Sequence, residues 1–180
     1  MKTHEEYMRH ALALAERAYS LGETPVGAIV VKDSTGEIVG EGYNLRESAR
    51  SPLAHAEIMA IDEASKTLGG WRLIGCTLYV TLEPCPMCAG AIINSRLPRV
   101  VYGASDPKAG SLESVINLFD LPYNHKPEVI SGVLGDECSE ILSRFFKSLR
   151  ECAERRKKAS PERGGGPSPK ATVEGCPRER

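Results

Sequence analysis

Apolar and polar residues alternate along this chain in blocks that predict helices and strands in turn. The first block, from residue 4 to about residue 20, has apolar residues at helical spacing with charged residues between them. A continuous apolar run at 25–31 follows, as is typical of a strand buried on both faces. The turn-forming segment at 32–36 then predicts a hairpin into a second strand at 37–43.

The same alternation continues to about residue 153. The other predicted elements are a helix at 54–67, a strand at 76–81, a helix from 86 to about 95, a strand at 99–103, a helical stretch near 112–119, a short strand at 128–131 and a helix from 136 to about 153. For the helix at 54–67 we expect an apolar face of Ile58, Met59, Ile61 and Ala64. Strands that alternate with helices indicate an α/β protein.

Residues 154–180 differ in composition from the rest of the chain. A run of charged residues is followed by a segment rich in Pro, Gly and Ser, which cannot bury a hydrophobic core. The sequence therefore predicts two parts, a folded domain at 1–153 and a disordered basic tail at 154–180.

Overall composition indicates an ordinary globular protein, since 41% of the 180 residues are hydrophobic and 26% are charged. The chain opens on polar and charged residues, and no apolar run approaches membrane-spanning length, so we expect no membrane partner and a cytoplasmic location. The net charge of −1 hides an asymmetry. Residues 153–180 hold eight Lys and Arg against four Asp and Glu, so the remainder is acidic. Charge alone would not suggest a nucleic-acid-binding protein.

Two short segments carry residues with metal chemistry. The first contains His55 and Glu57, and the second contains Cys85 and Cys88, with Pro86 between the cysteines. Proline suits the first position of a helix, which would place Cys85 at the helix N-terminus and Cys88 in the first turn. The positive end of a helix dipole lowers thiol pKa values and favours the thiolates that a metal needs.

These residues fit a catalytic zinc ion better than a structural one. His55, Cys85 and Cys88 supply three protein ligands, which leaves the fourth position of a tetrahedral zinc open to water. Glu57 is not needed as a ligand and can instead transfer protons. Because residues two apart on a helix point to different sides, His55 and Glu57 can face one metal only if it lies over the helix end. We therefore expect two helix N-termini directed at one zinc ion.

A structural zinc site or a redox Cys-x-x-Cys pair is the simpler alternative. A structural site would need a fourth Cys or His at ligand spacing. The other histidines are His4 and His10 in the first predicted helix and His125 in a late loop, and none has such a spacing.

The arrangement His-x-Glu followed by Pro-Cys-x-x-Cys resembles the signature of the zinc-dependent nucleobase deaminases. Further segments extend the resemblance over residues 4–150: Pro25-Val26-Gly27-Ala28, Glu41-Gly42-Tyr43-Asn44, the long match at 81–91, Val101-Tyr102-Gly103-Ala104 with Asp106, Asn124-His125, and Leu142 to Phe146. Over this range the chain resembles the bacterial tRNA-specific adenosine deaminases of the cytidine deaminase-like superfamily.

The resemblance implies a three-layer α/β/α sandwich with a five-stranded mixed sheet, one Zn²⁺ per subunit and a homodimer. It implies hydrolysis of adenosine to inosine, with release of ammonia, at wobble position 34 of a tRNA anticodon stem-loop, as in an arginine tRNA with A34. Carried over by position, it makes His55, Cys85 and Cys88 the zinc ligands and Glu57 the catalytic proton carrier. The substrate contacts it implies are Asn44, Ala56, Pro84, Asp106 and Phe145.

Several of these contacts have simpler explanations. Asn44 can be a turn residue at the end of a strand, and Asp106 can cap the helical stretch in its loop instead of accepting a hydrogen bond from a ribose 2′-OH. Phe145 and Phe146 cannot face the same side of a helix, so one is expected in the core and the other free to stack on a base. Lys108 is either a solvated charge or a phosphate contact.

Two other functions compete with tRNA deamination. A small-molecule nucleobase deaminase, with guanine as its leading substrate, would carry the same metal motif. A binding protein could use zinc for structure alone, in which case Glu57 would not be required for activity.

Overall fold

A single five-stranded sheet organises the described part of the chain, residues 2–159, in the computed structural model. The strands lie in the order β2-β1-β3-β4-β5; β1 is antiparallel to β2 and β3, whereas β3, β4 and β5 run parallel. The strands are β1 (Gly27–Lys32), β2 (Glu37–Tyr43), β3 (Cys76–Leu82), β4 (Arg99–Ala104) and β5 (Glu128–Ile130). The helices are α1 (His4–Ser20), α2 (Ala56–Leu68), α3 (Pro86–Asn94) and α4 (Gly135–Ala159), with a short 3₁₀ helix at Leu118–Asp120.

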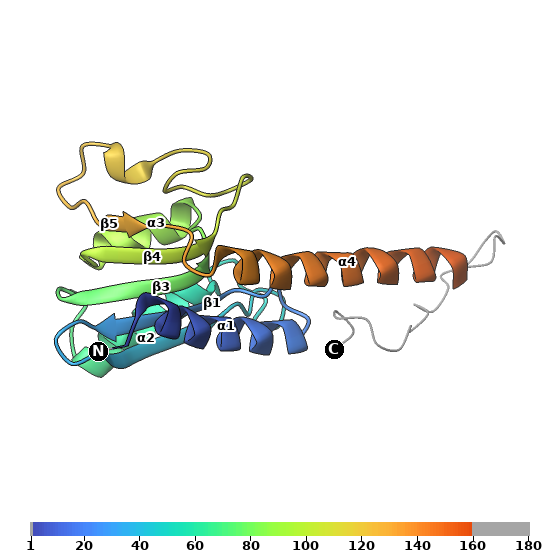
Figure 1. The fold of residues 1–180 in the computed structure, drawn as a ribbon, viewed down its shortest axis with the longest axis horizontal. Helices are drawn as coiled ribbons and strands as arrows, with labels where there is room; N and C mark the ends of the chain where they lie inside the picture. Colours follow the sequence, from blue (N-terminus) through green and yellow to red (C-terminus); the bar gives the residue numbers. More distant parts are fainter. Residues whose placement is uncertain (1, 160–180) are drawn as a thin grey trace.

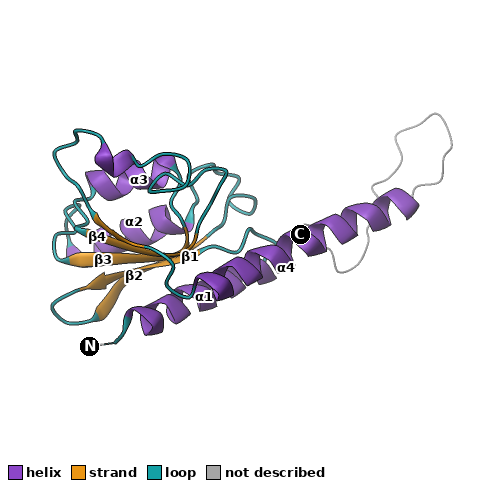
Figure 2. Cartoon of the chain, turned by 45° about the horizontal axis from the view of Figure 1, so that its top comes forward, coloured by secondary structure: helices purple, strands orange, loops and turns teal. Residues whose placement is uncertain are grey.

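The helices cover both faces of the sheet. Helices α1 and α4 lie side by side on one face and α2 and α3 lie on the other (Figures 1 and 2). Each face has its own apolar cluster, one beneath α2 and α3 and one beneath α1 and α4. The expected three-layer α/β/α sandwich with a mixed five-stranded sheet is therefore confirmed.

Helix α2 lies unusually close to the sheet because small residues face each other across the contact. A Cβ atom on Gly42 would come within 2.1 Å of the carbonyl oxygen of Ala56, and one on Gly40 within 2.3 Å of that of Ala60. The residues of α2 that are buried are accordingly Ala56, Glu57, Ala60 and Ala64. The predicted apolar face was therefore wrong in part, since Met59 is 39% exposed. This close contact sets the height of the N-terminus of α2 above the sheet.

We expect Gly42→Ala to lower the free energy of unfolding by about 1–3 kcal/mol, the usual cost of overpacking. The added methyl group would overlap the backbone of α2 and push the helix away from β2. The measurement is urea denaturation with zinc in excess. Gly70→Ala is the matched control, because no atom lies within 4 Å of its Cβ position, and its effect should stay within about 0.5 kcal/mol. Equal stability of the two variants would contradict the packing argument.

Two predicted elements differ from the structure. The helical stretch expected near 112–119 is turn at 112–114 and irregular at 115–117, with only the 3₁₀ helix at Leu118–Asp120. Tertiary hydrogen bonds explain this, because the backbone N–H groups of residues 112–114 all donate to the carboxylate of Glu83. The last helix was expected to end near Ala153 but continues to Ala159. Its added residues are mostly Ala, Arg, Lys and Glu, which have high helix propensity.

The longer α4 projects beyond the sheet (Figure 2). Helix α4 continues across the predicted boundary at 153/154, so residues 154–159 are helical and not disordered as predicted. The rest of the predicted tail, residues 160–180, lies outside the described residues, and the division into two parts stays a prediction. Within residues 2–159, no helix combines the length and apolar character needed to cross a membrane.

Candidate active site

Two helix N-termini and the carboxyl end of β3 meet at the residues with metal chemistry. His55 is the N-cap residue of α2 and Cys85 is the N-cap residue of α3, and neither side chain caps its own helix. Pro86 occupies the start of α3, as expected, and Cys88 lies in its first turn. Because both side chains are free of capping hydrogen bonds, they can turn toward a shared ligand at the positive ends of the two helices.

The three predicted ligand atoms form one compact group. His55 Nδ1 lies 3.7 Å from Cys85 Sγ and 3.6 Å from Cys88 Sγ, and the three ligand atoms lie within 4.8 Å of one another. Tetrahedral zinc with ordinary Zn–S and Zn–N bonds separates a sulfur and a nitrogen ligand by about 3.6 Å. The group therefore has the spacing, as well as the donor atoms, that a zinc ion requires.

The two cysteine side chains differ in protonation when no metal is bound. Hydrogen bonds from Cys88 and, to a lesser extent, His55 outweigh the effect of burial and lower the pKa of Cys85 to about 4. The same bond to Cys85, together with burial, raises the pKa of Cys88. The hydrogen bond to Cys85 also raises the pKa of His55. A metal cation would take the place of these protons, which is the exchange expected at a thiolate site.

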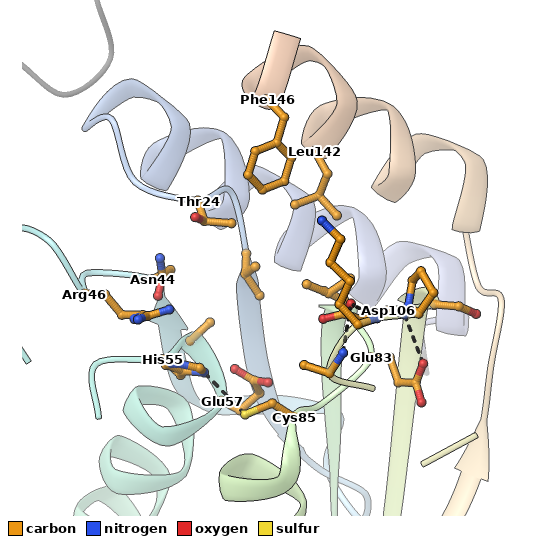
Figure 3. Close-up of a pocket in the computed structure, with 17 residues that line it drawn as sticks. Thr24, Asn44, Arg46, His55, Glu57, Glu83, Cys85, Asp106, Leu142 and Phe146 are labelled. Atoms are coloured by element: carbon orange, nitrogen blue, oxygen red, sulfur yellow. Dashed lines mark hydrogen bonds between the residues drawn. The ribbon is translucent and has the colours of Figure 1, made fainter. Parts of the chain in front are cut away.

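Glu57 lies beside this group without belonging to it. Its side chain is 4% exposed, and burial raises the pKa of its carboxyl group. In Figure 3 the carboxylate projects into the same space as His55 and Cys85. A buried carboxyl next to a metal site, but outside the ligand set, is placed to transfer protons.

A cavity of about 420 Å³ opens above the metal-binding group (Figure 3). Its floor contains His55, Glu57 and Cys85, whereas Cys88 is fully buried behind them. Its walls come from four regions: the loop before β1, the loop after β2, the loop after β4, and α4. The wall residues include Thr24, Asn44, Arg46, Asp106, Lys108, Leu142 and Phe146. This volume falls in the range of small-molecule pockets and is enough for a nucleobase.

The structure brings together three of the five predicted substrate contacts. Asn44, Ala56 and Asp106 line the cavity. Pro84 does not, because it is buried and its carbonyl oxygen accepts a hydrogen bond from Ser111 N at 2.9 Å. The structure corrects the predicted substrate contact by Phe145, since this side chain is 0% exposed and packs against Tyr19.

Phe146 takes the position predicted for Phe145. It is 43% exposed and lines the cavity, next to Leu142 on the preceding turn of α4 (Figure 3). The sequence contained a signal for this choice, because Cys138, Ile141 and Phe145 recur at positions i, i+3 and i+7. This stripe is the buried face of α4, so Phe146 is the residue left to face the cavity.

From the sequence, one charged residue at the cavity mouth was missed and the role of another was left open. Arg46 was not predicted, and Lys108 was read as either solvated or phosphate-binding; both line the cavity and are exposed. Asp106 Oδ1 accepts hydrogen bonds from Lys108 N at 2.9 Å and Ala109 N at 3.3 Å, so its carboxylate shapes its own loop.

Comparison with known proteins agrees with this site. Residues 1–104 match the family model of the cytidine and deoxycytidylate deaminase zinc-binding region. The tRNA-specific adenosine deaminase of Bacillus subtilis (strain 168) is 51% identical over 152 residues, which cover 84% of this chain and 93% of the relative.

Solved structures give the same assignment. A structure from work on A-to-I editing by tRNA:A34 deaminases at the wobble position of transfer RNA superimposes with a TM-score of 0.73 at 43% identity, covering 76% of this chain and 99% of the other. A guanine deaminase from Nitrosomonas europaea has a TM-score of 0.68 at 25% identity, covering 81% and 85% of the two chains. The higher identity and the near-complete coverage distinguish the first group from the second. The chain therefore belongs to the tRNA-specific adenosine deaminase family of zinc-dependent deaminases.

Proposed function

We propose that this protein hydrolyses adenosine to inosine at wobble position 34 of a tRNA and releases ammonia. One observation supports this above all: a cavity of nucleobase size ends on a His-Cys-Cys group with a buried carboxylate beside it. The 51% identity to a curated tRNA-specific adenosine deaminase supports adenosine in tRNA over free guanine.

In this proposal His55, Cys85 and Cys88 hold one zinc ion. When bound, zinc supplies a water that is nucleophilic near neutral pH. Glu57 would take one proton from the attacking water and deliver it to N1 of the adenine ring. It would then take the remaining proton from the hydroxyl group now on C6 and deliver it to the leaving amine. The C6–N6 bond breaks as the C6 carbonyl of inosine forms, so one water is consumed and one ammonia is released.

The cavity walls would bind the extruded base and the backbone on either side of it. Phe146 and Leu142 offer an apolar wall for the base, and Asn44 offers an amide for hydrogen bonds. Arg46 and Lys108 lie at the mouth on two different loops, where the flanking phosphates would pass. Substrate contacts by Ala56, Pro84 and Asp106 stay predictions.

The test compares four substrates: an arginine tRNA anticodon stem-loop with A34, the same adenosine closed into a duplex, free adenosine and free guanine. We expect inosine only in the stem-loop, because an unpaired wobble base costs little to extrude, whereas a paired base costs a few kcal/mol. Sequencing detects the inosine and ammonia release follows the free bases. Efficient turnover of guanine with no inosine in the stem-loop would establish the competing activity instead.

The outer end of α4 offers a second contact with RNA. Arg155, Lys157 and Lys158 are exposed there, on the same helix that brings Phe146 to the cavity. We expect Arg155→Gln/Lys157→Gln/Lys158→Gln to weaken binding of full-length tRNA and to reduce the slope of log affinity against log salt by about 0.9 per lost phosphate contact.

Truncation after Ala153 is a broader comparison for this variant, since it removes the same charges together with the end of α4 and residues 160–180. The triple variant should leave folding and kcat on the short stem-loop intact, because the three substituted residues are exposed. We expect the same of the truncation, because the composition of residues 154–180 cannot contribute a core. A salt slope equal to that of the unaltered protein would exclude the contact.

We also propose a homodimer that acts in the cytoplasm, where tRNA is found. Exposed apolar side chains lie along α2 and in the segments before and after it, namely Leu53, Met59, Leu68, Trp71 and Ile74. Ile74 is 73% exposed, and burial of such apolar side chains would favour association of two chains. Sedimentation velocity at micromolar concentration should show one species of twice the chain mass.

A further inference from the structure

The two loops that form the cavity walls contain no regular secondary structure where they carry their side chains. One, residues 44–54, brings Asn44 and Arg46; the other, residues 105–117, brings Asp106 and Lys108. Loops of this kind lack the hydrogen-bond ladder of a helix or sheet, so their buried N–H groups need other acceptors. Each loop finds its acceptor in one buried carboxylate.

Glu23 is the acceptor for the first loop. Its side chain is 0% exposed, between α1 and β1. Oε1 accepts from Ser48 N at 2.6 Å and Oε2 from Glu47 N at 3.2 Å. Oε2 also receives the side-chain amide of Asn44 at 3.5 Å. The same carboxylate thus holds the backbone of the loop and the side chain that enters the cavity.

Glu83 is the acceptor for the second loop. It is 2% exposed and follows β3, two residues before Cys85. Oε1 accepts from the backbone N–H groups of Leu112, Glu113 and Ser114 at 3.1, 2.8 and 2.9 Å. Oε2 accepts from Asp106 N at 3.0 Å and from the hydroxyl of Ser114. One side chain therefore fastens both ends of the loop segment that carries Lys108.

Gly110 allows this loop to close over Glu83. A Cβ atom at that position would come within 2.2 Å of Glu83 Oε2. Any larger residue would displace either the loop or the carboxylate. The backbone of the loop at Gly110 and the carboxylate of Glu83 are therefore packed with no room for a side chain between them.

Burying a carboxylate is costly unless hydrogen bonds compensate it. Within residues 2–159, neither Glu23 nor Glu83 forms an ion pair with Lys or Arg. Compensation comes instead from loop N–H and O–H groups, through charge-assisted hydrogen bonds that are stronger than neutral ones. Each loop therefore has one conformation in which its carboxylate is satisfied.

We propose that Glu23 and Glu83 are positioning residues, which hold the two cavity walls in the geometry that orients the substrate base. The proposal rests on the proposed deaminase function. Neither residue transfers a proton; each acts through the loop it holds. A displacement of about 1 Å at a reacting centre can cost about 100-fold in rate, so loosening a wall should be visible in turnover.

The experiment uses Glu23→Gln, Glu83→Gln and the double variant. Glutamine keeps the size but turns an NH₂ group toward the N–H donors of the loop. We expect faster amide hydrogen exchange at residues 47–48 in the first variant and at 106 and 112–114 in the second, each without effect on the other loop. Zinc content should stay near one per chain. Glu37→Gln, at an exposed position of β2, is the control.

On the A34 stem-loop we expect kcat to fall about 10–100-fold in each single variant, and the losses to multiply in the double variant, because the two loops are held independently. The dissociation constant for full-length tRNA should change less than about threefold, since phosphate contacts dominate it. Glu83→Asp, which keeps the charge, should restore part of the kcat that Glu83→Gln loses.

Gly110→Ala tests the same contact without altering any charge, and Gly70→Ala serves as its control. We expect Gly110→Ala to lower kcat like Glu83→Gln and to add little when combined with it, because both changes break one contact. If Glu83→Gln does not fold, Gly110→Ala still tests whether the contact with Glu83 positions the loop.

Unchanged hydrogen exchange in the variants, or loosened loops with unchanged kcat, would overturn the proposal. Failure of the proposed function has a different signature, since the unaltered protein would then leave the stem-loop unmodified. The kinetic comparison would in that case be made on whichever base the unaltered protein deaminates, and the exchange data would be unaffected.

Discussion

Glu57→Ala is expected to abolish deamination while leaving zinc content and fold intact. The carboxylate of Glu57 is buried beside the metal-binding group but outside it, so removing it takes away the proton carrier and no ligand. A general acid–base group is typically worth about 10²–10⁴ in rate. Because Glu57 would serve the attack, the ring nitrogen and the leaving amine in turn, we expect a loss at the upper end of this range. The measurements are initial rates on the A34 stem-loop and zinc analysis of the same preparation.

Glu63→Ala is the matched control for this variant. Glu63 lies on the same helix, but it is exposed and its carboxylate accepts a hydrogen bond from Glu41 N. Its removal should leave kcat unchanged. Full activity of Glu57→Ala would show that the carboxylate does no chemistry and would favour a purely structural metal. Loss of zinc in that variant would instead make Glu57 a ligand or a direct support of one.

The metal-binding group could be predicted from sequence because the rules that place it are local. Pro86 predicts the start of α3, and the spacing of Cys85 and Cys88 then places both thiols at one helix end. The two-residue spacing of His55 and Glu57 requires a metal beyond the helix end rather than on its flank. Both arguments use a few neighbouring residues, and in the structure all four lie at the N-termini of α2 and α3.

The cavity walls could not be predicted in this way, because they depend on contacts between distant residues. The 112–119 segment has the composition of a short helix, but its N–H groups donate to Glu83, nearly thirty residues earlier. The part of α2 that packs on β2 consists of alanines, because Gly40 and Gly42 let the helix approach so closely that larger side chains do not fit. The fold class was still predicted correctly, because it depends on the order of helices and strands. The residues that form the cavity walls could not all be predicted, because their positions depend on tertiary contacts.

Cys88→Ala is expected to show the opposite pattern from Glu57→Ala: zinc, stability and activity should fall together. Cys88 is fully buried and contributes one of the three side-chain ligand atoms found among residues 2–159. Loss of an outer-shell partner of a metal ligand typically costs about 10–100-fold in metal affinity, so loss of a ligand itself should cost at least that. A metal that binds only the folded state stabilises it by mass action, and this contribution should disappear with the metal.

The measurement is thermal unfolding with zinc and with a chelator. For the unaltered protein we expect the Tm to drop when the chelator is added, and for Cys88→Ala we expect a low Tm that the chelator no longer changes. Cys76→Ala separates the metal from the packing, because it deletes an equally buried thiol at the opposite end of β3 from the metal-binding group. It should lower the Tm somewhat but keep both zinc and the response to the chelator. If Cys88→Ala behaved like Cys76→Ala, its thiol would be a core residue and the three-ligand site would be wrong.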